Sequence, residues 1–475
     1  MTAKWIRRAT LRSIAAVLPL ILLGCNYNRQ TAEFHELYES GDYAQAAQVV
    51  TQQADSAPQR DAVLLRLEEG AILRAAGQPA ASNQAFTQAD DMISTYDDEP
   101  DVKVSQEAIA AGVNQSAMDY RGYAYDKIVM DTYKALNDLE LGDLDHAGVQ
   151  FNRAYSRQQE AVQKFSQQIA ANNQVQQQHQ GDYDVSQAQS DPQFQASMNQ
   201  QYSALNVKDL SAYANYVNPF TEYMRGVYLM ADAEDASDLE KAATALRRAA
   251  GLMKGNAYLL QDAQLAEKLA NGGHIDPTTY VVFETGLAPE RDEVRINFPV
   301  YHGGRRGGQV DYIAAAFPFL RYRPCDCEQA QIETSTGDFN TAVVCDMDDV
   351  ISQEFKNELP IVITRTLIST AIKAAAEYAV DQEQQANNNT ASALLNAVVK
   401  VAVVETNHAD LRTWKSLPKL FEVARFATPP DRKLNISIAG TPPIGLTLND
   451  GIVNVVYVKC VGLGSPLSIR QFKLK

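Results

Sequence analysis

The hydrophobic pattern of this chain changes period at Gly272-Gly273. Before this pair, apolar residues recur at helical spacing, and residues 257–269 form the last such stretch. After it, apolar and polar residues alternate, as in residues 293–298, which is typical of strands. A single change from helical to strand periodicity predicts an α+β fold in which helices and strands segregate. We therefore expect an all-α domain over residues 31–271 and a mixed, mostly antiparallel β domain with packed helices over residues 272–475.

The helical half carries a repeated turn between two helices. One copy is centred on Gly41, and a similar one follows 36 residues later at Gly77. A third copy surrounds Gly142, and a looser fourth lies around Gly226. Small residues in one helix of a copy and Tyr, Phe or Leu in the other let the two helices approach closely. This pattern resembles the tetratricopeptide repeat (TPR), which implies a solenoid of stacked helical hairpins; an irregular bundle with the same packing is the alternative.

The N-terminus has the pattern of a secretory signal peptide, a basic segment followed by a short apolar run. The run is shorter than the roughly 20 apolar residues that a membrane span requires, and Pro19 interrupts it. The residues that close the run are Leu22, Leu23, Gly24 and Cys25. They resemble the bacterial lipobox, whose cysteine is acylated and becomes the first residue of the mature protein. The resemblance implies a signal peptide over residues 1–24, lipidation of Cys25 and a polar tether over residues 25–30.

Asn26 follows the lipobox cysteine. In the enterobacterial sorting pattern, Asp at this position retains a lipoprotein in the inner membrane, so the resemblance implies the outer membrane of a Gram-negative bacterium, facing the periplasm. Two or three acyl chains suffice for stable anchoring, at about 0.8 kcal/mol per buried methylene. The net charge of -16 argues against a nucleic-acid partner, because phosphates are bound by clustered Lys and Arg.

The cysteines beyond the lipobox are Cys325, Cys327, Cys345 and Cys460. Disulfides persist in an oxidising compartment such as the periplasm. Because Cys325 and Cys327 are separated by one residue, we expect one of them to pair with Cys345 rather than with the other. A redox site would normally carry Cys-x-x-Cys, which is absent. The histidines lack paired ligand spacing, so we predict no metal site and no cofactor.

Three features are candidates for binding a partner or a ligand. Tyr120, Tyr123 and Tyr133 lie in one aromatic-rich stretch and can form a stripe; such a stripe is usually core, but it also fits a peptide-binding wall in the solenoid groove. Residues 157–205 are rich in Gln, Ala, Asn and Ser, and we interpret them as an insertion of helix extensions around a solvated loop near residues 181–192. Arg305 and Arg306 lie in a glycine-rich hairpin loop, where they can contact an anionic glycan or lipid headgroup.

Three strings resemble an uncharacterised family of Gram-negative envelope lipoproteins with a TPR-like N-terminal half. They are residues 121–139, residues 348–355 and residues 410–418, and Trp414 in the last string is expected to plug the core. The family brings no established activity. In domain layout, the chain is also similar to TPR-bearing outer-membrane lipoproteins that activate peptidoglycan synthases or help assemble outer-membrane proteins and pili.

We therefore expect a non-enzymatic adaptor that binds an envelope protein through its TPR groove and the membrane through acyl chains. No catalytic residue is predicted, because no nucleophile stands beside a partner base in a known motif. A glycan- or lipid-binding module is the alternative, and a hydrolase of unfamiliar type is the third hypothesis. Neither the oligomeric state nor the identity of the partner follows from the sequence.

Overall fold

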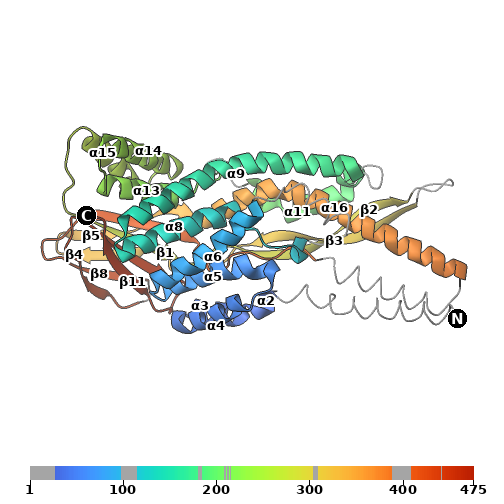
Figure 1. The fold of residues 1–475 in the computed structure, drawn as a ribbon, viewed down its shortest axis with the longest axis horizontal. Helices are drawn as coiled ribbons and strands as arrows, with labels where there is room; N and C mark the ends of the chain where they lie inside the picture. The colour runs from blue at the N-terminus through green and yellow to red at the C-terminus, as the bar shows by residue number, and fades with distance from the viewer. Residues whose placement is uncertain are drawn as a thin grey trace.

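The computed structural model describes residues 27–97, 115–179, 185–207, 210, 213, 215–302, 309–387, 408–439 and 441–475. These residues form a mixed α+β fold in which helices precede the first strand and strands dominate the C-terminal half. Figure 1 shows an elongated molecule with the larger sheet at one end and a two-stranded ribbon beside a long helix at the other. The fold class predicted from the change of period is confirmed at this level.

The helices of the first half precede every strand. They are α2 (Tyr27–Gln30), α3 (Ala32–Glu39), α4 (Tyr43–Asp55), α5 (Gln59–Ala75), α6 (Pro79–Asp97), α8 (Ala124–Leu141), α9 (Leu144–His179), α10 (Val185–Ser190), α11 (Pro192–Gln201), α12 (Ser203–Val207), α13 (Pro219–Ala231), α14 (Ala236–Leu252) and α15 (Ala257–Ala270). A short 3-10 turn, Gln115–Ala117, precedes α8.

The C-terminal half has three sheets and one long helix. Its strands are β1 (Thr278–Thr285), β2 (Glu290–His302), β3 (Gln309–Arg321), β4 (Ala330–Thr334), β5 (Gly337–Asn340), β6 (Ala342–Asp346), β7 (Leu420–Ala427), β8 (Lys433–Ile438), β9 (Ile444–Thr447), β10 (Val453–Cys460) and β11 (Ser468–Lys473). The long helix is α16 (Met347–Asn387), and it continues through Pro360.

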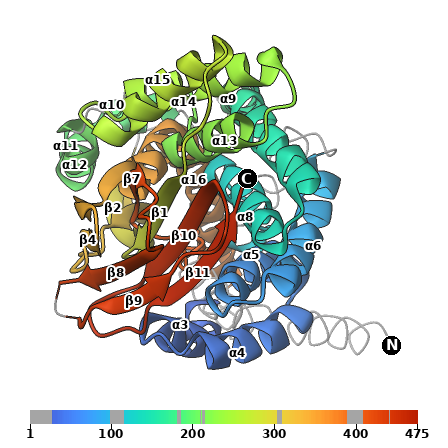
Figure 2. The same cartoon turned by 90° about the vertical axis from the view of Figure 1, so that its left-hand side faces the viewer.

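Glycine turns join the first helices into hairpins at the predicted positions. Gly41, Gly77 and Gly142 have φ values of 84°, 75° and 80°, a left-handed conformation that other residues adopt only with strain. Within the second hairpin, a Cβ on Gly70 would lie 2.4 Å from a ring carbon of Phe86. The small residue therefore lets α5 and α6 pack closely. Figure 2 shows the helices arranged in an arc around the larger sheet.

The larger sheet has the strand order β11-β10-β1-β7-β6, with β1 and β10 parallel and the other pairs antiparallel. Every residue of β1 and β10 is buried, because both faces of the sheet are covered. Tyr280 and Val282 of β1 join the core shared with the helices. Val281 and Phe283 point to the other face, where they pack against the four-stranded sheet β5-β4-β8-β9.

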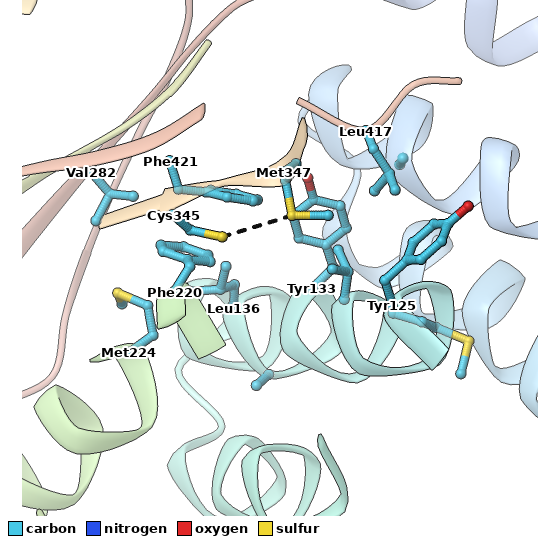
Figure 3. Close-up of a cluster of buried hydrophobic side chains, with 14 of the residues drawn as sticks. Tyr125, Tyr133, Leu136, Phe220, Met224, Val282, Cys345, Met347, Leu417 and Phe421 are labelled. Atoms are coloured by element: carbon cyan, nitrogen blue, oxygen red, sulfur yellow. Dashed lines mark hydrogen bonds between the residues drawn. The ribbon is translucent and has the colours of Figure 1, made fainter. Parts of the chain in front are cut away.

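The two halves share one hydrophobic core. Trp414 is fully buried, with its ring centroid 5.8 Å from that of Phe86 and 6.1 Å from that of Tyr133. The predicted role of Trp414 as a core plug is confirmed. Figure 3 shows the neighbouring part of this core, in which Tyr133 of α8 lies close to Phe421 of β7. The helices of the first half therefore pack around the larger sheet of the C-terminal half.

The glutamine-rich insertion is mostly helical in the described residues. Val175 of α9, Val185 of α10 and Phe194 of α11 are buried against the β2–β3 ribbon and the middle of α16. The expected solvated loop at residues 181–192 is wrong over Val185–Ser190, because widely spaced apolar residues in this polar sequence bury themselves on the ribbon. Residues 180–184 lie outside the described part of the chain.

The predicted polar tether at residues 25–30 is also wrong over Tyr27–Gln30, which form α2. Tyr27 is buried, with only 8% of its surface exposed. Its carbonyl oxygen accepts hydrogen bonds from the backbone N–H of Thr31, at 3.0 Å, and from the hydroxyl of Thr31, at 2.9 Å. The folded body therefore begins only two residues after Cys25.

Candidate functional site: a charged cleft beside helix α9

The tyrosine stripe forms core rather than a binding wall at two of its three positions. Tyr133 is 1% exposed and donates a hydrogen bond of 2.9 Å to Glu284 on β1. Tyr120 is 4% exposed and donates to Asp126 at 2.6 Å. The predicted partner-binding role of these two residues is wrong, because the C-terminal half covers both: Arg412 lies over the ring of Tyr120, which precedes α8, and Glu284 meets Tyr133 on α8. Tyr123 is half-buried and borders an open cavity.

Three segments, residues 121–139, 348–355 and 410–418, meet at the N-terminus of α8. Both carboxylate oxygens of Glu354 accept backbone N–H groups there, from Ala124 at 2.6 Å and from Tyr125 at 3.0 Å. The hydroxyl of Tyr125 in turn lies 3.2 Å from that of Thr413. A carboxyl group at a helix N-terminus satisfies N–H groups that have no partner within the helix. Glu354 thus joins α16 to the start of α8, although the contacting residues are more than 200 positions apart in the sequence.

Burial shifts the acidity of these carboxyl groups. It raises the pKa of Glu354 to about 8, and the like charge of Glu358 one helical turn away adds to the shift. Burial also raises the pKa of Asp126 to about 7, although Tyr120 and the N–H of Tyr123 donate hydrogen bonds to it. A carboxyl group with a raised pKa is a common sign of a functional site. Here, however, the oxygens of Glu354 are already occupied by backbone donors.

An open cleft of about 680 Å³ lies beside these groups, between α9 and the helices α6, α8 and α16. Arg153, Arg157, Glu160, Lys164 and Gln168 line one wall, at spacings of three and four residues that place them on one face of α9. Aromatic rings add apolar surface to this cavity, and they belong to Tyr123, Phe165 and Tyr216. We call this cavity the α9 cleft.

Ion pairs in the α9 cleft share their carboxylates. Lys127 and Lys164 both contact Asp97, at 3.0 and 2.7 Å. Burial raises the pKa of Asp97, but the two lysines outweigh it and hold that pKa below its usual value. Because one carboxylate serves two ammonium groups, the positive charge at this point is only partly compensated.

The same sharing occurs at the edge of the α9 cleft, where Arg153 and Arg157 both contact Asp90, Arg153 at 2.6 Å. The two ends of the row remain accessible: 41% of the Arg153 side chain and 37% of the Lys164 side chain are exposed. The mouth of the α9 cleft therefore presents an accessible guanidinium and an accessible ammonium beside aromatic surface. Such groups bind carboxylates and backbone carbonyl oxygens.

A second cavity of about 220 Å³ is continuous with the α9 cleft through Tyr123 and Glu358, which line both. The guanidinium of Arg291 lies 4.0 Å from the centroid of the Tyr123 ring and pairs with Glu358 at 3.1 Å. Arg412 contacts both oxygens of Asp410, at 2.9 and 2.8 Å. Both arginines therefore serve internal contacts, and Arg291 orients Tyr123 where the two cavities adjoin.

The remaining predicted sites have separate outcomes. Arg305 and Arg306 lie outside the described residues, as does Cys25 with the lipobox residues Leu22, Leu23 and Gly24. The predicted pairing of Cys327 with Cys345 is wrong in this fold: Cys345 is buried beside Met347, whereas Cys327 contacts Cys460. The pairing of Cys325 with Cys345 stays a prediction. Cys345 and Cys327 belong to clusters on opposite faces of the larger sheet, which keeps them apart.

Comparison with protein-family models, with curated proteins and with solved structures finds no match for this chain. Within the described ranges, no group of three or more His, Cys, Asp or Glu side chains is arranged to hold a metal ion. No helix in the same ranges is both long and apolar enough to cross a membrane.

The sequence did not single out the cations of the α9 cleft. Arg153 precedes the glutamine-rich insertion, and Arg157 and Lys164 lie within it, where the polar composition suggested solvated helix. Their spacing along one helix face was the available signal. That spacing shows that the residues share a face, but the neighbouring α16 comes from about 200 residues later and cannot be placed by periodicity.

Proposed function

We propose that this protein is a non-enzymatic, lipid-anchored adaptor of the Gram-negative envelope that binds an extended polypeptide segment in the α9 cleft. The observation that carries the proposal is the pair of accessible cations, Arg153 and Lys164, at the mouth of an open cavity with aromatic surface. Cations beside aromatic rings suit a segment that offers carboxylates and apolar side chains.

The binding surface proposed here differs from the groove expected of a TPR protein. We propose that α3–α9 and α13–α14 are TPR-like hairpins, and two close contacts support this: Gly70 against Phe86, and Gly226 against Leu246. The inner face of the arc is occupied by the protein's own sheet and by Trp414. A partner would therefore bind along α9, at the margin of the arc.

The membrane attachment and the outer-membrane location rest on the lipobox at Cys25 and on Asn26 after it. A lipid anchor would confine the adaptor to one membrane surface and raise its local concentration near a partner in the same envelope. The non-enzymatic character is supported by the raised-pKa carboxyl of Glu354, whose two oxygens each accept a backbone N–H. A general acid or base needs its carboxyl free to exchange a proton with a substrate.

Site-specific photo-crosslinking in cells tests the proposal. p-Benzoylphenylalanine placed at Phe165, in the α9 cleft, should give a protein adduct of defined mass, whereas the same probe at the exposed Leu260 of α15 should not. The double variant Arg153→Ala/Lys164→Ala should reduce the adduct at least tenfold. A matched control removes two exposed cations of α14, Lys241→Ala/Arg247→Ala, and should leave the adduct unchanged.

Two outcomes would overturn the adaptor hypothesis. An adduct that survives loss of both cations would show that the α9 cleft does not bind its partner through them. An adduct that disappears after digestion of peptidoglycan, and contains no second protein, would instead support the glycan-binding alternative. The amide of Gln168 and the rings of the α9 cleft are groups that sugars also use, so this second outcome has a specific structural basis.

A further inference from the structure

The chain enters its fold almost immediately after Cys25, and this restricts how the body can lie on a membrane. Tyr27 is buried and begins α2, and the next residues, Asn28 and Arg29, are exposed. Tyr27 follows Cys25 by two residues, so their Cα atoms are at most about 7.6 Å apart. Acyl chains on Cys25 would insert into the bilayer, so the surface around α2 cannot move far from the headgroups.

We propose that the surface around α2 rests directly on phospholipid headgroups, an inference that depends on the lipid anchor of the proposed function. This surface surrounds a cavity of about 330 Å³ lined by Tyr27, Arg29, Arg60, Ser116 and His408, among others, and we call it the anchor face. It is assembled from five separate parts of the chain. Its position follows from the two-residue connection to Cys25 alone, without any assumption about the partner.

Arg29 gives the anchor face an exposed cation that suits the phosphate of a phospholipid. Arg29 is exposed at the end of α2, and Arg60 lies beside it in the same cavity, with its own contact to Asp61 at 3.2 Å. His408 and Glu293 also line this cavity and contact each other at 3.1 Å. Headgroup phosphates can accept hydrogen bonds from the arginines, while the acyl chains of Cys25 supply most of the binding energy.

The arrangement leaves the α9 cleft accessible. Figure 1 shows α2, α3 and α4 along one long side of the molecule and α9 along the other. With the anchor face on the bilayer, α9 is directed toward the periplasm, where a partner segment can reach Arg153 and Lys164. A long tether would allow any orientation, whereas a two-residue connection selects this one.

Fluorescence quenching on vesicles tests the anchor face. The acylated mature protein is reconstituted into vesicles of phosphatidylethanolamine and phosphatidylglycerol that carry a nitroxide on a fraction of the headgroups. A small fluorescent amino acid is placed either at Ser116, in the anchor face, or at Val149, which is 52% exposed on α9. We expect quenching at Ser116 to be at least threefold stronger than at Val149.

A linker variant gives the control. Twenty Gly and Ser residues inserted between Asn26 and Tyr27 should abolish the difference, because they let the body rotate freely at about 20 Å or more from the bilayer. Equal quenching at the two positions without the linker would overturn the inference. The mass of the intact protein distinguishes a failure of the lipid anchor from a failure of the proposed orientation. A protein that carries no acyl chains would refute the anchor. An acylated protein with equal quenching at the two positions would refute only the orientation.

A second inference concerns two buried thiols. The Sγ atoms of Cys327 and Cys460 lie 3.3 Å apart, and each residue is 1% exposed. The end of β1 fixes both: the hydroxyl of Thr285 donates to the carbonyl of Cys327 at 2.7 Å, and the N–H of Gly286 donates to that of Cys460 at 3.0 Å. The two sulfur atoms are therefore in contact on a rigid part of the fold.

We infer that Cys327 and Cys460 form a disulfide in the exported protein, an inference that rests on the proposed periplasmic location. The two thiols would lose two protons and two electrons to a protein disulfide of the export compartment, which is reduced to a dithiol. The S–S bond then forms as the sulfur atoms close to about 2.05 Å. Cys325, which is less buried, and Cys345 would remain free thiols.

A tryptic digest without reduction distinguishes this pairing from the local one. Trypsin releases residues 322–356, which contain Cys325, Cys327 and Cys345, and residues 460–470, which contain Cys460. We expect these two peptides to be linked in wild type and in Cys325→Ser, but not in Cys327→Ser. Free thiols throughout, or a bond confined to residues 322–356, would overturn the inference. The acyl mass on Cys25, measured in the same sample, shows independently whether the protein was exported.

Discussion

Two regions of this protein are rich in charged side chains. In one region these side chains are buried and paired with each other, and in the other some of them remain exposed to solvent. Between the helices and the larger sheet, Glu284 accepts hydrogen bonds from Tyr133, at 2.9 Å, and Tyr457, at 2.6 Å, and it also contacts Lys459. All four residues are nearly inaccessible to solvent. In the α9 cleft, by contrast, carboxylates are shared between cations, and Arg153 keeps 41% of its side chain exposed. The first region holds the fold together, and the second is available to a partner.

A buried charged group and an exposed one should differ in how much their removal destabilises the protein. Glu68 accepts the backbone N–H groups of Lys415, at 2.7 Å, and Ser416, at 3.2 Å, and so fixes the segment that carries Trp414. Such a carboxylate replaces water as the partner of buried N–H groups, and its removal leaves them unsatisfied. Removing an exposed cation leaves water in its place. The predictions below test this distinction.

The largest effect is expected at Glu284. Replacing it with alanine would leave the buried ammonium of Lys459 without a counter-charge, which typically costs about 3–5 kcal/mol. We expect the free energy of unfolding, measured by urea denaturation, to fall by that amount in Glu284→Ala. The double variant Glu284→Met/Lys459→Met should recover part of the loss, because neither charge is then buried alone. Equal losses in the single and double variants would contradict the assignment.

A control for this prediction lies on the surface. Glu267 pairs with Arg247 at 3.3 Å, and about half of each side chain is exposed. Because water and salt screen such pairs, Glu267→Ala should change the free energy of unfolding by less than about 0.5 kcal/mol.

The next effect is a pH dependence that originates at Glu354. Burial raises its folded-state pKa from 4.5 to about 8. Between these pH values the folded state holds a proton that the unfolded state has lost, so stability falls as pH rises. Below pH 4.5 both states are protonated, and the contribution is flat. One such group gives a slope of at most about 1.4 kcal/mol per pH unit.

Glu354→Gln should reduce this slope between pH 5 and pH 8, because glutamine does not titrate. Urea denaturation at several pH values measures the change. Glu160→Gln, at an exposed position on α9, is the matched control and should leave the slope unchanged. A slope in Glu354→Gln as steep as in wild type would show that other buried carboxyl groups, such as Asp126, carry the dependence.

Much of the fold was predictable because periodicity reports burial. The strand candidates at residues 280–284, 293–298 and 310–314 all lie in strands, and the glycine turns at Gly41 and Gly77 lie between helices. Strands β4, β5, β7 and β9 were not predicted. Three of them have only four or five residues, too few for a periodic pattern to stand out, and β7 is buried at most positions, which removes the alternation.

The binding region could not be predicted to the same extent. The pattern of Tyr120 to Tyr133 identifies a covered helix face, but it does not identify what covers it, and here the cover comes from strands more than 150 residues later. The same limitation applies to the cysteines. Spacing along the chain favoured Cys345, whereas β10 brings Cys460 to Cys327 from over 130 residues away. Contacts of this kind depend on topology, which local sequence does not encode.

The smallest effect on the free energy of unfolding is expected at Arg153, which we compare with its neighbour Arg157. Arg153 and Arg157 are one helical turn apart and contact the same carboxylate of Asp90. Arg157 is only 12% exposed and also contacts Asp131 at 2.9 Å. Arg153→Ala should therefore lower the free energy of unfolding by less than about 1 kcal/mol, as for other exposed ion pairs. Arg157→Ala should cost clearly more, because it leaves two buried carboxylates with fewer partners.

The same pair of variants separates stability from binding. Crosslinking through p-benzoylphenylalanine at Phe165 should fall in Arg153→Ala even though urea denaturation shows a nearly unchanged protein. The loss should be greater at low ionic strength, because salt screens an exposed charge over about 8–10 Å. If Arg153→Ala destabilises the protein as much as Arg157→Ala, then Arg153 stabilises the fold as Arg157 does and is not available to a partner. If stability and crosslinking are both unchanged, Arg153 takes no part in binding and the adaptor surface must be sought elsewhere.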